Sequence, residues 1–195
     1  MKDLTDELTT ATDSAQNFWQ QDLADTVDAI SWQYKSCVYH RKLFNWIDVP
    51  AEGYIVQLGV GYGLSLEILA SRFGDRVIGF DIFNHGNHPL VEISDVRNLK
   101  DMPIAYVHCN VGNFYNTQKL RKVGLEWCFR NLVSGGVCLT SGGNDFVETQ
   151  LGFTISSVAD KYNCKVEQMP NDPSFIEMTQ QGRYNHNHEC LVIKQ

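Results

Sequence analysis

Residues 55–81 constrain the fold more than any other part of the chain. They read as an apolar strand, a glycine-rich turn, a helix, and a second strand that ends in an acid. Gly59, Gly61 and Gly63 allow a tight turn with positive φ and a close approach of the backbone to a ligand. The following helix directs free N–H groups and the positive end of its dipole toward the same place. Asp81 then stands where a carboxylate can accept hydrogen bonds from ribose hydroxyls.

The spacing of these glycines distinguishes two classes of cofactor. Dinucleotide-binding turns have the pattern G-x-G-x-x-G, in which the third glycine lets helix and strand pack closely. Here the third glycine comes one residue earlier, and Leu64 occupies the dinucleotide position. The resulting G-x-G-x-G resembles motif I of class I S-adenosylmethionine (SAM) dependent methyltransferases, although any βαβ unit with a glycine-rich turn is the simpler alternative. The resemblance implies SAM as cofactor and a set of cofactor-binding residues: Gly59, Gly61, Gly63, Ser65, Asp81, Ile82 and Asn110.

Composition limits the range of functions. The net charge is −7 and the sequence holds no run of Lys or Arg, which argues against nucleic acid as a partner and favours a small-molecule substrate. No apolar run approaches the roughly 18–20 residues that span a bilayer, and the N-terminus lacks the apolar stretch of a signal peptide. We therefore expect a cytoplasmic protein that does not enter a membrane. The oligomeric state stays open, a homo-oligomer included.

The order of apolar segments predicts an α/β protein with a Rossmann-like, mostly parallel sheet and one antiparallel strand near the C-terminus. Expected strands cover residues 54–58, 76–80, 104–108, 137–140, 165–169 and 190–194. Expected helices cover residues 64–73, 90–99, 117–132 and part of 145–162. Residues 1–50 are expected to form an N-terminal arm and amphipathic helices that act as a lid or pack on the core. Residues 51–195 would form the SAM-binding domain.

Two further segments narrow the resemblance. Residues 131–139 are similar to the methyltransferase family's entry to its fifth strand, and residues 107–117 resemble a segment of the macrocin O-methyltransferase-like group. That group methylates sugar hydroxyls on natural products, so the resemblance implies O-methylation of a small, sugar-bearing metabolite. Its members bind a divalent cation with aspartates, whereas the matching positions here are Asn110, Gly112, Ser141 and Gly142. Because a hard cation prefers charged oxygen ligands, we expect no metal.

The chain also departs from the family in length. Only about 27 residues separate Asp81 from His108, where the family usually has one more strand and helix. This leaves open a sheet one strand short of seven, in which either the third or the fourth strand is missing. In both cases Asn110 follows a strand at the carboxyl edge of the sheet, beside the cofactor.

Methyl transfer to a hydroxyl benefits from a general base, and His is the usual choice near neutral pH. The expected fold brings His85, His88, Asp145 and His188 to the carboxyl edge of the sheet, and these are the catalytic candidates. Spacing singles out none of them, and histidines in polar loops are more often solvated surface residues. Two other functions stay open, namely a non-catalytic protein that keeps the fold and a nicotinamide-dependent oxidoreductase.

Overall fold

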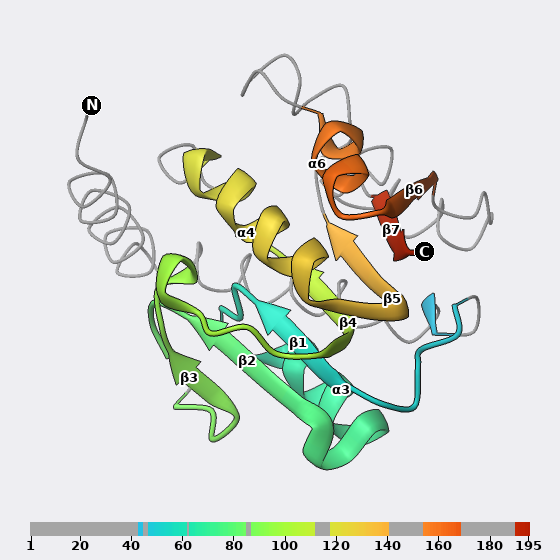
Figure 1. Cartoon of the computed structure of the whole chain (residues 1–195). Helices are drawn as coiled ribbons and strands as arrows, with labels where there is room; N and C mark the ends of the chain where they lie inside the picture. The colour runs from blue at the N-terminus through green and yellow to red at the C-terminus, as the bar shows by residue number, and fades with distance from the viewer. Residues whose placement is uncertain are drawn as a thin grey trace, which may run out of the picture.

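A computed structural model describes residues 43–44, 47–61, 63–84, 87–111, 118–140, 154–168 and 190–195. Its centre is a seven-stranded sheet with the strand order β3-β2-β1-β4-β5-β7-β6 (Figure 1). The strands are β1 (Tyr54–Leu58), β2 (Val77–Asp81), β3 (Val91–Ile93), β4 (Ile104–Cys109), β5 (Leu132–Thr140), β6 (Cys164–Gln168) and β7 (Cys190–Lys194). The described helices are α3 (Leu64–Phe73), α4 (Gln118–Asn131) and α6 (Ile155–Lys161), with short 3₁₀ turns η1 (Gly74–Arg76) and η2 (Val96–Asn98).

The direction of the strands brings one set of strand ends together. β1 runs parallel to β2 and β4, β4 runs parallel to β5, and β7 is antiparallel to both β5 and β6. The carboxyl ends of β1, β2, β4 and β5 therefore meet at one edge of the sheet. The start of β7 lies at the same edge, because Cys190 is paired with Thr140. The expected α/β fold with an antiparallel strand near the C-terminus is confirmed.

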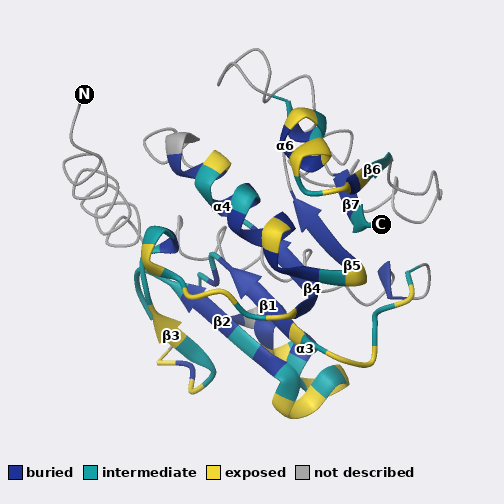
Figure 2. Ribbon diagram, viewed as in Figure 1, coloured by how far each residue is buried: buried dark blue, intermediate teal, exposed yellow. Residues whose placement is uncertain are grey.

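Helices cover both faces of the sheet, as Figure 1 shows. Leu66 and Leu69 of α3 pack on one face, in a cluster with Ile55, Tyr106 and other buried residues. α4 and α6 pack on the other face, where their apolar side chains join Val56, Leu58 and Val107. The central strands are buried by these two layers, whereas β3 at the edge is largely exposed (Figure 2).

The number of strands corrects one expectation. The sheet has seven strands, so neither the third nor the fourth strand is missing. β3 is the third, only three residues long, and β4 is the fourth. The helix predicted over residues 90–99 is wrong, since this segment holds β3 and then η2. Asp95 caps η2 two residues after the end of β3, since its side chain accepts the backbone N–H of Arg97.

The β2–β3 connection is unusually short for parallel strands, which are most often joined by a helix. β3 pairs only with the last three residues of β2, with Gly79 opposite Val91 and Asp81 opposite Ile93. At about 3.3 Å per residue, the chain has to return only about 7 Å along the strand direction before pairing again. Nine residues are enough for that return, and none of those described, residues 82–84 and 87–90, is helical.

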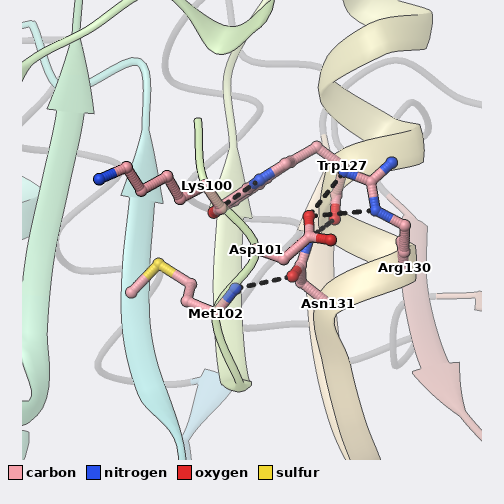
Figure 3. A network of polar contacts seen from close by, with 6 residues as sticks. All are labelled: Lys100, Asp101, Met102, Trp127, Arg130 and Asn131. Carbon is pink, nitrogen blue, oxygen red and sulfur yellow. Dashed lines mark hydrogen bonds and ion pairs between the residues drawn. The ribbon is translucent and has the colours of Figure 1, made fainter. Parts of the chain in front are cut away.

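At the amino end of β4, a polar network connects α4 with the segment that precedes β4 (Figure 3). The Asn131 side chain accepts the Met102 N–H at 2.8 Å and donates to the Trp127 carbonyl at 2.8 Å and to Asp101 at 3.3 Å. Arg130 also donates to Asp101, and this hydrogen bond holds the pKa of the Asp101 carboxyl below its ordinary value. The network fixes the end of α4 far from the carboxyl edge.

Candidate functional site

The glycine turn between β1 and α3 lies at the carboxyl edge of the sheet. Gly59, Gly61 and Gly63 have φ values of 82°, 61° and 88°, in the left-handed region that favours glycine. The Gly59 N–H donates to the Phe80 carbonyl at 2.8 Å, which ties the turn to the end of β2. A Cβ atom on Gly59 would lie 3.2 Å from the Cβ of Asn110. The predicted turn is therefore present, and close packing as well as backbone conformation requires glycine at its start.

Asp81 closes the turn from the end of β2. Its Oδ2 accepts the N–H groups of Val60 at 2.6 Å and Gly61 at 3.0 Å, and its Oδ1 accepts that of Phe83 at 3.3 Å. An ionised carboxylate offers about four acceptor positions, so one on Oδ1 remains after these three bonds. Asp81 thus holds the turn in shape and keeps capacity for one further donor.

Four N–H groups among the described residues of the turn are bonded within the protein and are not directed at a ligand. Those of Gly59, Val60 and Gly61 are bonded to β2, and that of Gly63 donates to the Val60 carbonyl at 3.3 Å. A pyrophosphate would need such donors directed at it. The turn instead presents glycine backbone beside a carboxylate acceptor, and this arrangement suits a ligand rich in hydrogen-bond donors, such as ribose hydroxyls and an ammonium group.

Gln57 adds a second acceptor near the turn. It lies on β1 one residue before the strand ends, opposite Gly79 of β2 and His108 of β4. The side chain is 2% exposed, and within the described part of the chain its Oε1 accepts no hydrogen bond. A buried carbonyl oxygen without a donor is costly, and such atoms call for an explanation. Together with Asp81 it gives this edge the acceptor chemistry that SAM, with its ribose hydroxyls and ammonium group, would satisfy.

Asn110 follows β4 next to this turn. Its N–H donates to the Leu58 carbonyl at 2.7 Å, and its side-chain nitrogen lies 3.4 Å from Nδ1 of the buried His108. The expectation that Asn110 stands at a strand end beside the glycine turn is confirmed in its position. Its contact with a cofactor stays a prediction.

His88 lies on the other side of the turn, in the β2–β3 connection. Its Nε2 is 3.0 Å from Oε1 of Glu67 on α3, and its Nδ1 accepts the Leu90 N–H at 3.2 Å. The ring is buried against Gly63, where an added Cβ would lie 3.1 Å from Cδ2. A role as general base stays a prediction, and it would require the ring to give up the Leu90 N–H, because both ring nitrogens are engaged.

A buried guanidinium, that of Arg121, lies on the α4 face near the carboxyl end of β5. Arg121 of α4 is 3% exposed and donates to the Thr140 hydroxyl at 3.3 Å. Burial lowers the pKa of this guanidinium. A hydrogen bond with Cys128 lowers the pKa of the Cys109 thiol, and the charge of Arg121 adds to that effect. Burial raises the pKa of Cys128. These thiols are free and buried, which fits the packing role of cysteines in a reduced interior.

The structure brings together most of the predicted cofactor-binding residues. Ser65 is buried in the first turn of α3, and Ile82 directly follows Asp81. The catalytic candidates His85, Asp145 and His188 lie outside the described residues, as do Gly112, Ser141 and Gly142. In the part of the chain that the structure describes, no three His, Cys, Asp or Glu side chains gather to hold a metal ion. Sequence reasoning missed Asn84, Glu67 and Arg121 as parts of this edge, since no motif marks them.

Comparison with solved structures identifies the fold. Streptomyces venezuelae DesVI aligns with a TM-score of 0.57 at 12% identity, over 90% of this chain and 100% of its own. CalS10, an amino pentose methyltransferase from Micromonospora echinaspora solved with SAM bound, gives 0.52 at 12% identity, over 95% and 97%. The SAM-bound magnesium protoporphyrin IX methyltransferase of Synechocystis PCC 6803 gives 0.54 at 12% identity, over 95% and 92%. The class I methyltransferase fold expected from the sequence is confirmed.

Other comparisons add little to this. No family model and no curated protein matches the sequence. The chain spans 50% of the length of a Haemonchus contortus phosphoethanolamine N-methyltransferase 2 that it also resembles, at a TM-score of 0.45. No helix among the described residues is both long enough and apolar enough to cross a bilayer.

Proposed function

We propose that this protein is a SAM-dependent methyltransferase. The observation that carries the proposal is the glycine turn tied to Asp81 at the carboxyl edge of a class I methyltransferase sheet. Solved structures with this fold contain SAM. The N–H groups of Gly59, Val60, Gly61 and Gly63 are bonded within the protein. Acceptor oxygens lie beside them, which supports SAM over a cofactor with a pyrophosphate.

The described residues suggest how SAM would be held. The remaining acceptor position of Asp81 would take a ribose hydroxyl, in a charge-assisted hydrogen bond. The unsatisfied Oε1 of Gln57 is suited to an N–H donor, such as the ammonium group of the methionine part. The glycines at 59, 61 and 63 would let the ligand approach the backbone closely. Asn110, Ser65 and Ile82 would complete the cofactor side.

SAM supplies the activated methyl group when bound, so the chain itself has to orient the acceptor and exclude water. Alignment of this kind can contribute about 7–11 kcal/mol to lowering a barrier. A hydroxyl acceptor would also need its proton removed. We keep His85, His88, Asp145 and His188 as candidates for that base, with His88 the least suited because its Nδ1 already accepts a hydrogen bond.

The acceptor we propose is an oxygen of a small, sugar-bearing metabolite. The resemblance to the macrocin O-methyltransferase-like group supports this, and CalS10 is an amino pentose methyltransferase. We further propose that the reaction needs no metal, because Asn110, Gly112, Ser141 and Gly142 stand where that group has aspartates. The cytoplasm is the proposed location, and association of identical chains remains compatible with it.

Cofactor binding is the direct test. We expect S-adenosylhomocysteine (SAH) and SAM to bind in isothermal titration calorimetry and to raise the melting temperature, with about 2.7 kcal/mol of added stability at 100 times the Kd. NAD should do neither. If NAD binds and SAH does not at millimolar concentration, the proposal is wrong.

Asp81 and Asp95 form a matched pair for this test. Each carboxylate accepts a backbone N–H two residues further along the chain, but only Asp81 touches the glycine turn. Asp81→Ala should weaken SAH binding, whereas Asp95→Ala should leave it unchanged. Methyl transfer from labelled SAM to a panel of hydroxylated, amino-sugar and porphyrin acceptors then separates an enzyme from a protein that binds the cofactor without turnover.

A further inference from the structure

One segment holds the glycine turn at two separate points. At the end of β2, Asp81 accepts the N–H groups of Val60 and Gly61, which belong to the first half of the turn. Seven residues later, His88 packs on Gly63, which belongs to the second half. Asp81 at the end of β2 and His88 in the β2–β3 connection therefore contact opposite halves of the turn. A change at either residue can alter the shape of the turn.

His88 links three parts of the molecule. Its Nδ1 accepts the Leu90 N–H, so the proton of a neutral ring is assigned to Nε2, which faces Glu67. Glu67 is in the first turn of α3, and its N–H donates to the Gly63 carbonyl at 3.0 Å. The imidazole thus connects the start of β3 with the first turn of α3 and fills the space beside Gly63.

Asn84 fixes the backbone of His88 in place. Its Oδ1 accepts the His88 N–H at 2.8 Å, and its Nδ2 donates to the His88 carbonyl at 2.9 Å. Both backbone groups of His88 are therefore bonded to one side chain. With the backbone held and both ring nitrogens engaged, the buried His88 ring has little freedom to rotate.

We propose that His88 is a positioning residue for the cofactor: through Gly63 and Glu67 it keeps the glycine turn in the shape that SAM binding needs. The inference rests on the proposed function for its ligand. This role needs no proton transfer, because it rests on the hydrogen bonds of Nδ1 with the Leu90 N–H and of Nε2 with Glu67. Asn84 and Glu67 support the same role, one through the His88 backbone and the other through its ring.

Substitutions can separate the two ring contacts. The Oδ1 of asparagine can replace the Nδ1 acceptor, and the Nε2 of glutamine can replace the Nε2 donor. His88→Asn should keep the Leu90 N–H protected and lose the link to α3, whereas His88→Gln should do the reverse. His88→Ala loses both contacts. Glu67→Gln keeps an acceptor for the imidazole N–H, so it should behave like the wild type, in contrast to Glu67→Ala.

Two measurements on each purified variant test the proposal. Amide hydrogen exchange in the ligand-free protein reports the turn through the N–H groups of Val60 and Gly61. Calorimetric titration with SAH reports the cofactor site. We expect His88→Ala to speed exchange at both amides and to weaken SAH binding about tenfold, the equivalent of one buried hydrogen bond. His88→Asn and His88→Gln should each weaken binding by about threefold.

Asp95→Ala is the control for a general loss of stability, because Asp95 caps η2 next to β3 without touching the turn. It should leave exchange at Val60 and Gly61 and the SAH affinity at wild-type values.

The inference is overturned if His88→Ala leaves both values unchanged while the protein is folded, or if Asp95→Ala changes them as much. A wild-type protein that binds no SAH would refute the proposed function, and the exchange rates would still decide whether His88 holds the turn. If His88→Ala does not fold, the asparagine and glutamine variants and the Glu67 pair decide the question.

Discussion

The substitution Gly63→Ala would disturb the turn and His88 together. Gly63 has φ 88° and ψ 1°, a left-handed conformation that costs an L-residue about 1–2 kcal/mol. The new Cβ would also lie 3.1 Å from Cδ2 of His88, closer than ordinary van der Waals contact. The ring would have to shift and strain its hydrogen bond to Leu90 or Glu67, worth about 0.5–1.5 kcal/mol. The sum is a loss of about 1.5–3.5 kcal/mol in the free energy of unfolding.

Chemical denaturation measures that loss, and SAH titration of the folded variant measures its effect on the site. Gly74→Ala is the matched control, because Gly74 ends the same helix with φ 59° and ψ −134°, and a Cβ there would meet nothing within 4 Å. It should cost about 1–3 kcal/mol of stability from backbone strain alone and leave SAH affinity intact.

Gly63→Asn separates the backbone strain from the clash with His88, since asparagine tolerates the left-handed region but still carries a Cβ. It should recover stability relative to Gly63→Ala and remain weak in SAH binding. The reasoning fails if folded Gly63→Ala binds SAH like the wild type, or if Gly74→Ala loses as much affinity.

Three further outcomes are expected. Asp81→Asn keeps acceptor oxygen but loses the charge that strengthens hydrogen bonds, so its SAH affinity in calorimetry should fall between the wild type and Asp81→Ala; equal affinity in all three would contradict a ribose contact. Asn131→Ala removes a buried amide with three partners and should lower the free energy of unfolding by about 1–3 kcal/mol without changing SAH affinity. Because Arg130 depresses the pKa of Asp101 in the folded state, that pair stabilises the protein above the unfolded pKa of the carboxyl and ceases to do so as the pH falls through the folded pKa. Asp101→Asn should therefore destabilise the protein at pH 7, and its difference from the wild type in thermal unfolding should shrink as the pH falls through the carboxyl's folded-state pKa.

The elements with strong local signals could be predicted from the sequence. Strand 54–58, helix 64–73 and strand 190–194 have the expected bounds in the structure, because their apolar patterns define them. Glycines also flank the first two. β5 starts at Leu132, five residues before the predicted start, since pairing with Ile104 extends the strand through a Ser-Gly-Gly sequence that is typical of a turn. β3 was mistaken for a helix because three residues carry no usable periodicity.

The site was predictable in its position and less so in its contacts. The carboxyl edge, the glycines and Asp81 follow from spacing and topology. The bonds that Asp81 makes to Val60 and Gly61 do not, because they depend on how the turn folds back over β2. Likewise the contact between His88 and Glu67 joins residues 21 positions apart on a loop and a helix. Only their three-dimensional placement shows that a candidate base is engaged as a packing and hydrogen-bonding group.

The short β2–β3 connection also bears on how the chain folds. Pairing Gly79 with Val91 closes a loop of 12 residues, whereas pairing Ile55 with Tyr106 in the sheet centre closes one of 51. The difference is about two doublings of loop length, or about 1.2 kcal/mol of chain entropy. Pairing β2 with β3 therefore costs little chain entropy, whereas pairing β1 with β4 requires segments far apart in the sequence to come together. Among the described strand pairs, β2–β3 closes the shortest loop, so the segment that carries Asp81 and His88 is ordered at the smallest cost in chain entropy.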